Sequence, residues 1–296
     1  MREVLSRPTP LKREKRKKAF ARFIWAIVIL VVLYVGVGLL SHLPRVSINE
    51  VETRGLKALD SHEVSGSILS YLGGNTALVY SRANIFIFSK NNVMEFVLGK
   101  YPRIYRVNMI ERNSQKLVLD IEERQAAYVW CGHEAPAYSD RFIKKDCYFV
   151  DQKGFVFDNS PYFTDGVYMA IYGGLDPAAP IIGQTIDLTN SIEDIKAIAR
   201  RLDDSVTPIH SLILRGDGQH EFLLDIWSNT GNFAKILWNE DVTLEETFQK
   251  INATIGEETF QAEFDKNAGT LEYIDTRFRN RVFYKFKTPE LKDVAQ

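Results

Sequence analysis

An uninterrupted apolar run near the N-terminus is the strongest pattern in the sequence. Residues 23–40, FIWAIVILVVLYVGVGLL, contain no charged side chain. With a rise of about 1.5 Å per residue, an α-helix of this length spans roughly 27 Å, close to the thickness of a bilayer's hydrocarbon core. The run therefore predicts a single transmembrane helix over residues 23–41.

After this run the pattern becomes periodic and predicts a strand followed by a helix. Residues 46–55, VSINEVETRG, form an extended run that ends at Gly55. Ser61 can cap a helix, which GGN at residues 73–75 would end. The apolar side chains between these limits recur at helical spacing: Val64, Ile68, Tyr71 and Leu72.

A second helix and two strands complete this block. Ser89 can cap the helix, and Pro102 lies just beyond its end. The helix carries one stripe of side chains: Val93, Phe96, Val97 and Lys100. Residues 103–111 and 116–124 predict strands joined by a turn at Asn113-Ser114, and one face of the second strand is expected to be buried. The alternating positions of that face are Leu117, Leu119 and Ile121. Residues 46–124 thus predict a compact β-α-α-β-β module.

Residues 125–287 predict a mainly antiparallel β-domain with two inserted helices, so the fold class is α+β. Helical spacing recurs in IEDIKAIARRL, residues 192–202, and in TLEETFQKINATI, residues 243–255. Residues 210–227 predict two strands around a Gly-Asp-Gly turn. The last two strands, 271–278 and 281–287, flank a tight turn at Arg279-Asn280. The polar tail at 288–296 is expected to be flexible.

Charge predicts how the chain is oriented in a membrane. Residues 1–22 carry nine Lys or Arg and two Glu, a net +7, whereas the whole chain carries −1, so the remainder carries −8. Basic residues before the helix predict a cytoplasmic tail at 1–22 and extracytoplasmic domains.

The alternative is a cleaved signal peptide, whose apolar core would be about 7–15 residues long and followed by an A-x-A-like site. GLLSHLPR offers no such site, so we expect a retained anchor. The acidic remainder argues against a nucleic-acid binder.

Cys131 and Cys147 are the only cysteines. In an oxidising compartment they could pair and close a loop, which would contribute on the order of 3 kcal/mol. Two unpaired thiols are the alternative reading. A metal site that included His133 would need further ligands at suitable spacing.

The sequence shows no pattern typical of catalysis or of cofactor binding. Its five histidines are scattered without an H-E-x-x-H motif, and its Gly-rich segments lack the lysine and spacing of a phosphate loop. VSGS at residues 64–67 lies on a predicted helix and does not match G-x-S-x-G. We therefore expect a non-enzyme without a cofactor or metal. An anchored envelope enzyme with a site assembled from distant residues is an alternative.

The order of these segments resembles the FtsQ/DivIB family of bacterial cell-division proteins. A β-α-α-β-β module directly after one membrane anchor resembles a POTRA domain. KYPRIYRVNMIERNSQKLVLDIEERQAAYV resembles the family's helix-Pro-strand-strand signature, with Glu123-Arg124 at its closing pair. YFVDQKGFVF resembles the strand-Asp-x-x-Gly-strand hairpin, with Gly154 at the turn, and YIDTRFRNRVFYKF resembles the terminal I-D-L-R-aromatic motif. Thr276 departs from the usual Leu.

The resemblance implies a non-catalytic, single-pass scaffold of the bacterial divisome in the cytoplasmic membrane at the division septum. Its partners would be FtsB/DivIC-like and FtsL-like coiled-coil proteins, through which it would regulate septal peptidoglycan synthesis. The POTRA-like domain would offer a contact for other divisome proteins. A POTRA-bearing transport or secretion component is the alternative, although the sequence shows neither a second module nor barrel-length alternation.

The final hairpin is the candidate partner-binding site. Val282, Tyr284 and Phe286 share one face of its last strand, and basic residues alternate with Phe283 on the other. From the residues alone, this edge could receive a partner's strand, or its Lys and Arg could simply protect it from aggregation. The family resemblance favours docking. The candidate residues are Arg277, Phe278, Arg281, Phe283, Tyr284 and Lys285.

Overall fold

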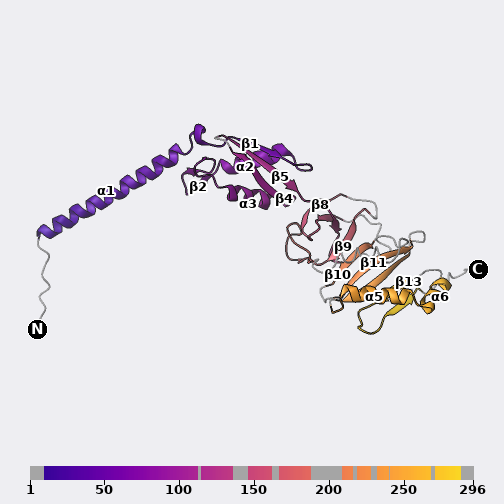
Figure 1. The fold of residues 1–296 in the computed structure, drawn as a ribbon. Helices are drawn as coiled ribbons and strands as arrows, with labels where there is room; N and C mark the ends of the chain where they lie inside the picture. The colour runs from indigo at the N-terminus through magenta and orange to yellow at the C-terminus, as the bar shows by residue number, and fades with distance from the viewer. Residues whose placement is uncertain are drawn as a thin grey trace, which may run out of the picture. The chain divides into compact units, whose positions relative to one another are not determined.

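A computed structural model describes residues 10–112, 115–135, 146–161, 167–187, 209–215, 219–227, 232–239, 241–267 and 271–287. The fold is α+β, as predicted: an N-terminal apolar helix, a small sheet with two helices, and a large, mostly antiparallel sheet (Figure 1). The chain divides into two compact units, Met1–Glu123 and Arg124–Gln296. The boundary predicted from the sequence lay between residues 124 and 125.

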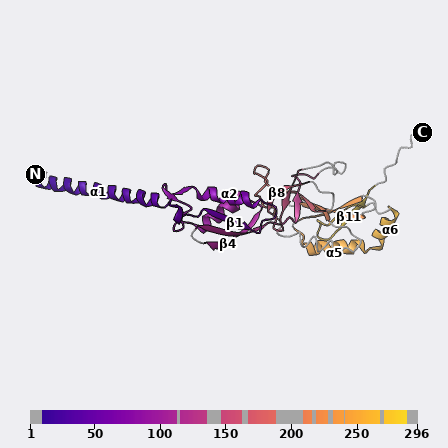
Figure 2. The same ribbon diagram turned by 90° about the horizontal axis from the view of Figure 1, so that it is seen from above.

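The apolar run forms the C-terminal part of a long helix, α1, Pro10–Leu40, which leads into the first unit (Figure 2). Its segment Lys17–Leu40 is long and apolar enough to cross a membrane. A single-pass anchor and a signal sequence both have these properties. Most of its large apolar side chains are exposed, Trp25 at 67% and Leu30 at 65%, as expected for a helix whose solvent is lipid.

The first unit contains a three-stranded sheet in the order β1-β5-β4. β1 runs parallel to β5, and β4 runs antiparallel to it. The elements after the short 3₁₀ helix Pro44–Val46 are β1 Glu50–Arg54, α2 Ser61–Leu72, β2 Asn75–Thr76, β3 Tyr80–Ser81, α3 Lys90–Lys100, β4 Ile104–Arg112 and β5 Lys116–Glu123. The sequence did not predict the small β2–β3 hairpin. The predicted turn at 113–114 lies outside the described residues.

Both helices of this unit pack on the same face of the sheet. The stripes predicted from spacing supply the buried core: Val64, Ile68 and Leu72 from α2, Val93 and Val97 from α3, and Leu117, Leu119 and Ile121 from β5. Tyr71 and Phe96 are only partly buried, and their rings stack with centroids 4.3 Å apart. The predicted helix stripes are thus confirmed at their central positions.

The N-cap of α2 lies one residue before the predicted position. Asp60, not Ser61, caps the helix, because its carboxylate accepts hydrogen bonds from the backbone N–H groups of His62 at 2.6 Å and Glu63 at 3.2 Å. The Ser61 hydroxyl instead shares a hydrogen bond with Thr53 on β1 at 2.8 Å. Ser89 caps α3, as predicted.

Glu123 and Arg124, the adjacent pair singled out in the sequence, make their contacts in different units. The Glu123 carboxylate accepts hydrogen bonds from three backbone N–H groups of the β1–α2 loop, those of Lys57, Ala58 and Leu59, each at 3.0 Å. Arg124 belongs to the second unit, where it donates to Asp151 at 2.6 Å and covers the Phe155 ring. The pair therefore secures the last strand of one unit and the first loop of the next.

The second unit is built on a nine-stranded sheet in the order β14-β13-β12-β11-β10-β9-β6-β7-β8. Three neighbouring pairs, β6–β9, β9–β10 and β12–β13, are parallel, and the others are antiparallel. The strands are β6 Tyr128–Trp130, β7 Cys147–Val150, β8 Val156–Ser160, β9 Met169–Gly173, β10 Ile209–Leu214, β11 Gln219–Trp227, β12 Asn232–Asn239, β13 Leu271–Asp275 and β14 Phe283–Phe286.

Two described helices belong to this unit. α5, Leu244–Ile255, was predicted, and its cap Thr243 accepts from the backbone of Glu246 at 3.2 Å. α6, Glu258–Lys266, was not predicted, although Phe260 and Phe264 four positions apart are a helical signal. The helix predicted over 192–202, the Gly-Asp-Gly turn at 216–218 and the tail at 288–296 lie outside the described residues.

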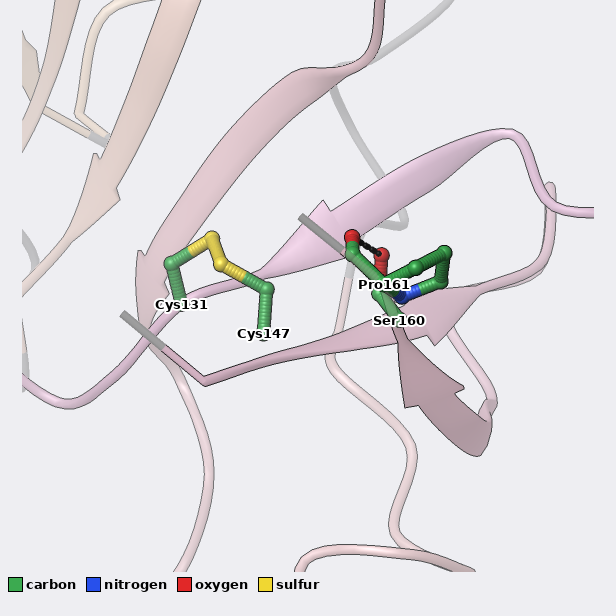
Figure 3. Close-up of a disulfide and its surroundings, with 4 residues drawn as sticks. All are labelled: Cys131, Cys147, Ser160 and Pro161. Carbon is green, nitrogen blue, oxygen red and sulfur yellow. Dashed lines mark hydrogen bonds between the residues drawn. A yellow bond between two sulfur atoms is a disulfide. The ribbon is translucent and has the colours of Figure 1, made fainter. Parts of the chain in front are cut away.

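A disulfide joins Cys131 and Cys147, which border the paired strands β6 and β7 (Figure 3).

The turn between β7 and β8 follows the Asp-x-x-Gly pattern. The Asp151 carboxylate accepts from the backbone N–H groups of Lys153 at 2.8 Å and Phe155 at 3.0 Å. Gly154 has a φ of 83°, which an L side chain rarely adopts. At the end of β8, the Ser160 hydroxyl donates to the carbonyl of Pro161.

Candidate docking edge at the final hairpin

β14, the last described strand, forms one edge of the nine-stranded sheet and pairs only with β13 in the part of the chain that the structure describes. Its register places Tyr284 opposite Ile274 and Phe283 opposite Asp275. An edge strand directs alternate backbone N–H and C=O groups away from its neighbour, where another strand can bind them. The backbone of β14 can therefore extend the sheet.

The turn of this hairpin differs from the prediction. Residues 276–282 connect β13 and β14, whereas the sequence predicted a tight turn between longer strands. Thr276 directly follows β13, and both its N–H and its hydroxyl donate to the carbonyl of Leu237 on β12, each at 2.9 Å. The backbone hydrogen bond completes the parallel pairing of β13 with β12. The Lys250 ammonium on α5 donates to the carbonyl of Phe278 at 2.8 Å. These hydrogen bonds attach the start of the loop to β12 and α5.

Arg277 holds the base of this loop. Its guanidinium donates two hydrogen bonds to the carboxylate of Asp275, at 2.8 Å and 2.6 Å, and its backbone N–H donates a third at 3.1 Å. Asp275 is only 6% exposed. Bidentate pairs of this kind fix geometry. Arg277 was a candidate binding residue, and the structure gives it this internal partner.

Two exposed phenylalanines lie side by side at the edge. Phe278 in the loop is 51% exposed and Phe283 on β14 is 46% exposed. Their ring centroids are 5.2 Å apart in an edge-to-face arrangement. Exposed aromatic side chains that contact each other form an apolar patch of the kind that anchors protein interfaces.

Cationic side chains accompany the aromatic pair. Arg279 and Arg281 are exposed, and the described residues provide neither with an ion pair. Lys285 is exposed and donates to Glu272 at 2.8 Å, which raises the pKa of Lys285. We define the aromatic–basic edge as Phe278, Arg279, Arg281, Phe283 and Lys285. Arg279 was assigned to the turn in the sequence analysis and was missed, although it continues the alternation of basic and aromatic residues.

Tyr284 faces the core of the unit. Its ring packs edge-to-face on Phe260 of α6, with centroids 4.9 Å apart, and burial raises the pKa of its hydroxyl. Val282 and Phe286 also pack against the core. The alternation proposed from the sequence thus holds, and of the six candidate residues Phe278, Arg281, Phe283 and Lys285 are exposed.

The described residues contain no group of three or more His, Cys, Asp or Glu side chains that could hold a metal ion. No protein-family model matches the sequence, and no curated protein matches it.

Proposed function

We propose that the protein is a non-catalytic, single-pass membrane scaffold of the bacterial divisome, with both folded units outside the cytoplasm and β14 as a docking strand. The observation that carries this proposal is the aromatic–basic edge on a strand at the end of a sheet. The order of anchor, POTRA-like module, Asp-x-x-Gly hairpin and terminal hairpin supports the division role through its resemblance to the FtsQ/DivIB family.

Docking would occur by addition of a partner strand to β14. Main-chain hydrogen bonds give such pairing its affinity, and side-chain contacts give it specificity. Phe278 and Phe283 would receive apolar side chains, and Arg279 and Arg281 would attract a segment rich in Asp and Glu. The partner would be an FtsB/DivIC-like protein paired with an FtsL-like protein, which would link the scaffold to septal peptidoglycan synthesis.

Protection from aggregation is the competing explanation for the basic residues. Lys and Arg on an edge strand suffice for that purpose, because their charges oppose edge-to-edge pairing. Protection does not explain two exposed phenylalanine rings in mutual contact, since exposed apolar area promotes association. The aromatic pair therefore favours docking.

Photocrosslinking in living cells tests this proposal. A photoreactive amino acid replaces Phe283 in the full-length protein, and the same amino acid at Ile110, a 56%-exposed position on β4, serves as the control. We expect position 283 alone to capture a small single-pass coiled-coil protein, identified by mass spectrometry. Capture of the same protein at both positions, or at neither, would contradict the assignment of β14 as the docking strand.

A further inference from the structure

The end of α1 is attached to the small β2–β3 hairpin of the first unit. The Tyr34 hydroxyl donates to the carbonyl of Ala77, and the Tyr80 hydroxyl donates to the carbonyl of Tyr34 at 3.4 Å. The two tyrosine rings pack edge-to-face with centroids 5.1 Å apart. A residue within the apolar run thus contacts the tip of the hairpin.

Gly38 allows this close approach. A Cβ atom at position 38 would lie 2.7 Å from Cγ2 of Val79, so a larger residue would push the hairpin away from the helix. Further along, the Ser41 hydroxyl accepts a hydrogen bond from the backbone N–H of Ser81 at 3.0 Å. The helix and the hairpin therefore form a packed contact from Tyr34 to Ser41.

The carbonyl groups at the hairpin tip all have partners. Ala77 accepts from Tyr34 and from the backbone N–H of Val79, Leu78 accepts from the Asn75 amide at 3.5 Å, and Val79 lies 3.1 Å from Nε2 of His42. The side chain of Leu78, the central residue of the tip, is 89% exposed. An apolar side chain over carbonyls that already have partners lowers the free-energy cost of entering lipid, where an unpaired backbone group costs several kcal/mol.

The hairpin tip lies alongside the apolar run. From Tyr34 to Leu40 the helix rises about 9 Å along its axis. If Leu40 marks the end of the hydrocarbon-spanning segment, a group that contacts Tyr34 lies below the membrane surface. The Tyr34 and Tyr80 hydroxyls both donate hydrogen bonds at this level, so neither would carry an unpaired donor into the hydrocarbon.

We infer that residues 77–79, the tip of the β2–β3 hairpin, are inserted in the extracytoplasmic leaflet of the lipid bilayer, with Leu78 among the acyl chains. This inference rests on the proposed function in one respect: α1 must be a retained anchor. The inserted tip and α1 hold the first unit at a fixed height on the membrane, so its sheet and helices are presented close to the lipid headgroups.

Lipid accessibility in reconstituted vesicles tests this inference. The full-length protein carries one introduced cysteine at a time, Leu78→Cys, Leu30→Cys within α1 or Ile110→Cys on β4, each bearing a nitroxide spin label. Cys131 and Cys147 are joined to each other, so the label reacts at the introduced thiol. Power-saturation EPR measures how accessible each label is to oxygen, which concentrates in lipid, and to a water-soluble nickel chelate. Leu78 is exposed, so the label leaves the fold intact.

We expect the labels at positions 78 and 30 to be more accessible to oxygen than to the nickel chelate. The label at 110 should be more accessible to the nickel chelate. A label at 78 that favours nickel while position 30 favours oxygen would overturn the insertion of the tip and leave the anchor in place. Labels at both positions that favour nickel would overturn the anchor as well. A label at 78 that is accessible to neither oxygen nor the nickel chelate would show that the tip is covered by protein, such as a second copy of the chain, and not by lipid.

Discussion

At the scale of single residues, Glu123 shows how one side chain can close a module. Its carboxylate accepts hydrogen bonds from three consecutive backbone N–H groups, whereas its neighbour Glu122 is 60% exposed and lies 3.9 Å from Arg106. We expect Glu123→Ala to lower the free energy of unfolding of the first unit by about 2 kcal/mol, since hydrogen bonds to a charged group contribute about 1.5–3 kcal/mol. Urea unfolding of the full chain in detergent measures this change. Glu122→Ala is the matched control, and equal losses in both variants would contradict the role of Glu123.

Asp60 contributes in a pH-dependent way. The hydrogen bonds from the backbone N–H groups of Glu63 and His62 lower its pKa in the folded state. Its stabilising effect is therefore complete above the ordinary carboxyl pKa and is lost as the pH falls through the lowered folded-state pKa. We expect Asp60→Ala to lower the melting temperature of the first unit at pH 7, with the difference from wild type shrinking toward pH 3. Asp60→Asn keeps a cap that does not titrate, so at pH 7 it should melt close to wild type. A difference between Asp60→Ala and wild type that stays constant with pH would contradict the ionised cap.

At the scale of elements, the sequence predicted what depends on local periodicity. The stripes of α2, α3 and α5 repeat at helical spacing, and Asp151 to Gly154 form a local turn. Side-chain hydrogen bonds between distant residues were not predictable. The Thr276 hydroxyl donates to Leu237 and the Lys250 ammonium donates to Phe278, and both contacts involve the seven-residue loop from 276 to 282, where the sequence predicted a tight turn. The edge position of β14 agrees with the prediction that the final hairpin forms a sheet edge, but the contact between Phe278 and Phe283 depends on this loop.

The disulfide adds a constraint between β6 and β7. Its cysteines are 16 positions apart, and closing a loop of this size removes unfolded-state entropy worth about 3 kcal/mol. We expect the Cys131→Ser/Cys147→Ser variant to unfold at lower urea concentration, with the loss confined to the second unit. Reductant should shift the wild type to the same midpoint and leave the double variant unchanged. A wild type that is unaffected by reductant would show that the bond contributes nothing to stability.

At the scale of the whole molecule, the proposed function anchors the N-terminal helix in the membrane and assigns partner binding to β14. Residues 23–296 carry a net charge of −8, so the cationic residues at β14 are a local exception in an acidic part of the chain. Arg279 and Arg281 would therefore select acidic partner segments at this edge more than elsewhere, and would speed their capture at low salt.

The partner-binding role of β14 is tested by changing its apolar anchor and its charge together. We expect Phe283→Ala/Lys285→Glu to weaken binding of the full-length protein to an FtsB/DivIC-like partner by about 2–4 kcal/mol, because a truncated aromatic anchor and a reversed charge both act at the interface. Phe283 is 46% exposed, and the exposed Lys285 side chain forms an ion pair with the half-exposed Glu272, so the unfolding midpoint should change little.

A matched double variant separates docking from general surface effects. Val167→Ala/Lys153→Glu truncates one exposed apolar residue and reverses one lysine in the same unit, with Lys153 in the turn between β7 and β8 at the other end of the sheet. Affinities measured by titration calorimetry in detergent should fall for the β14 variant alone. If both variants bind as the wild type does, β14 is a protected edge and the partner binds elsewhere. If both weaken equally, the loss reflects net charge and not a docking strand.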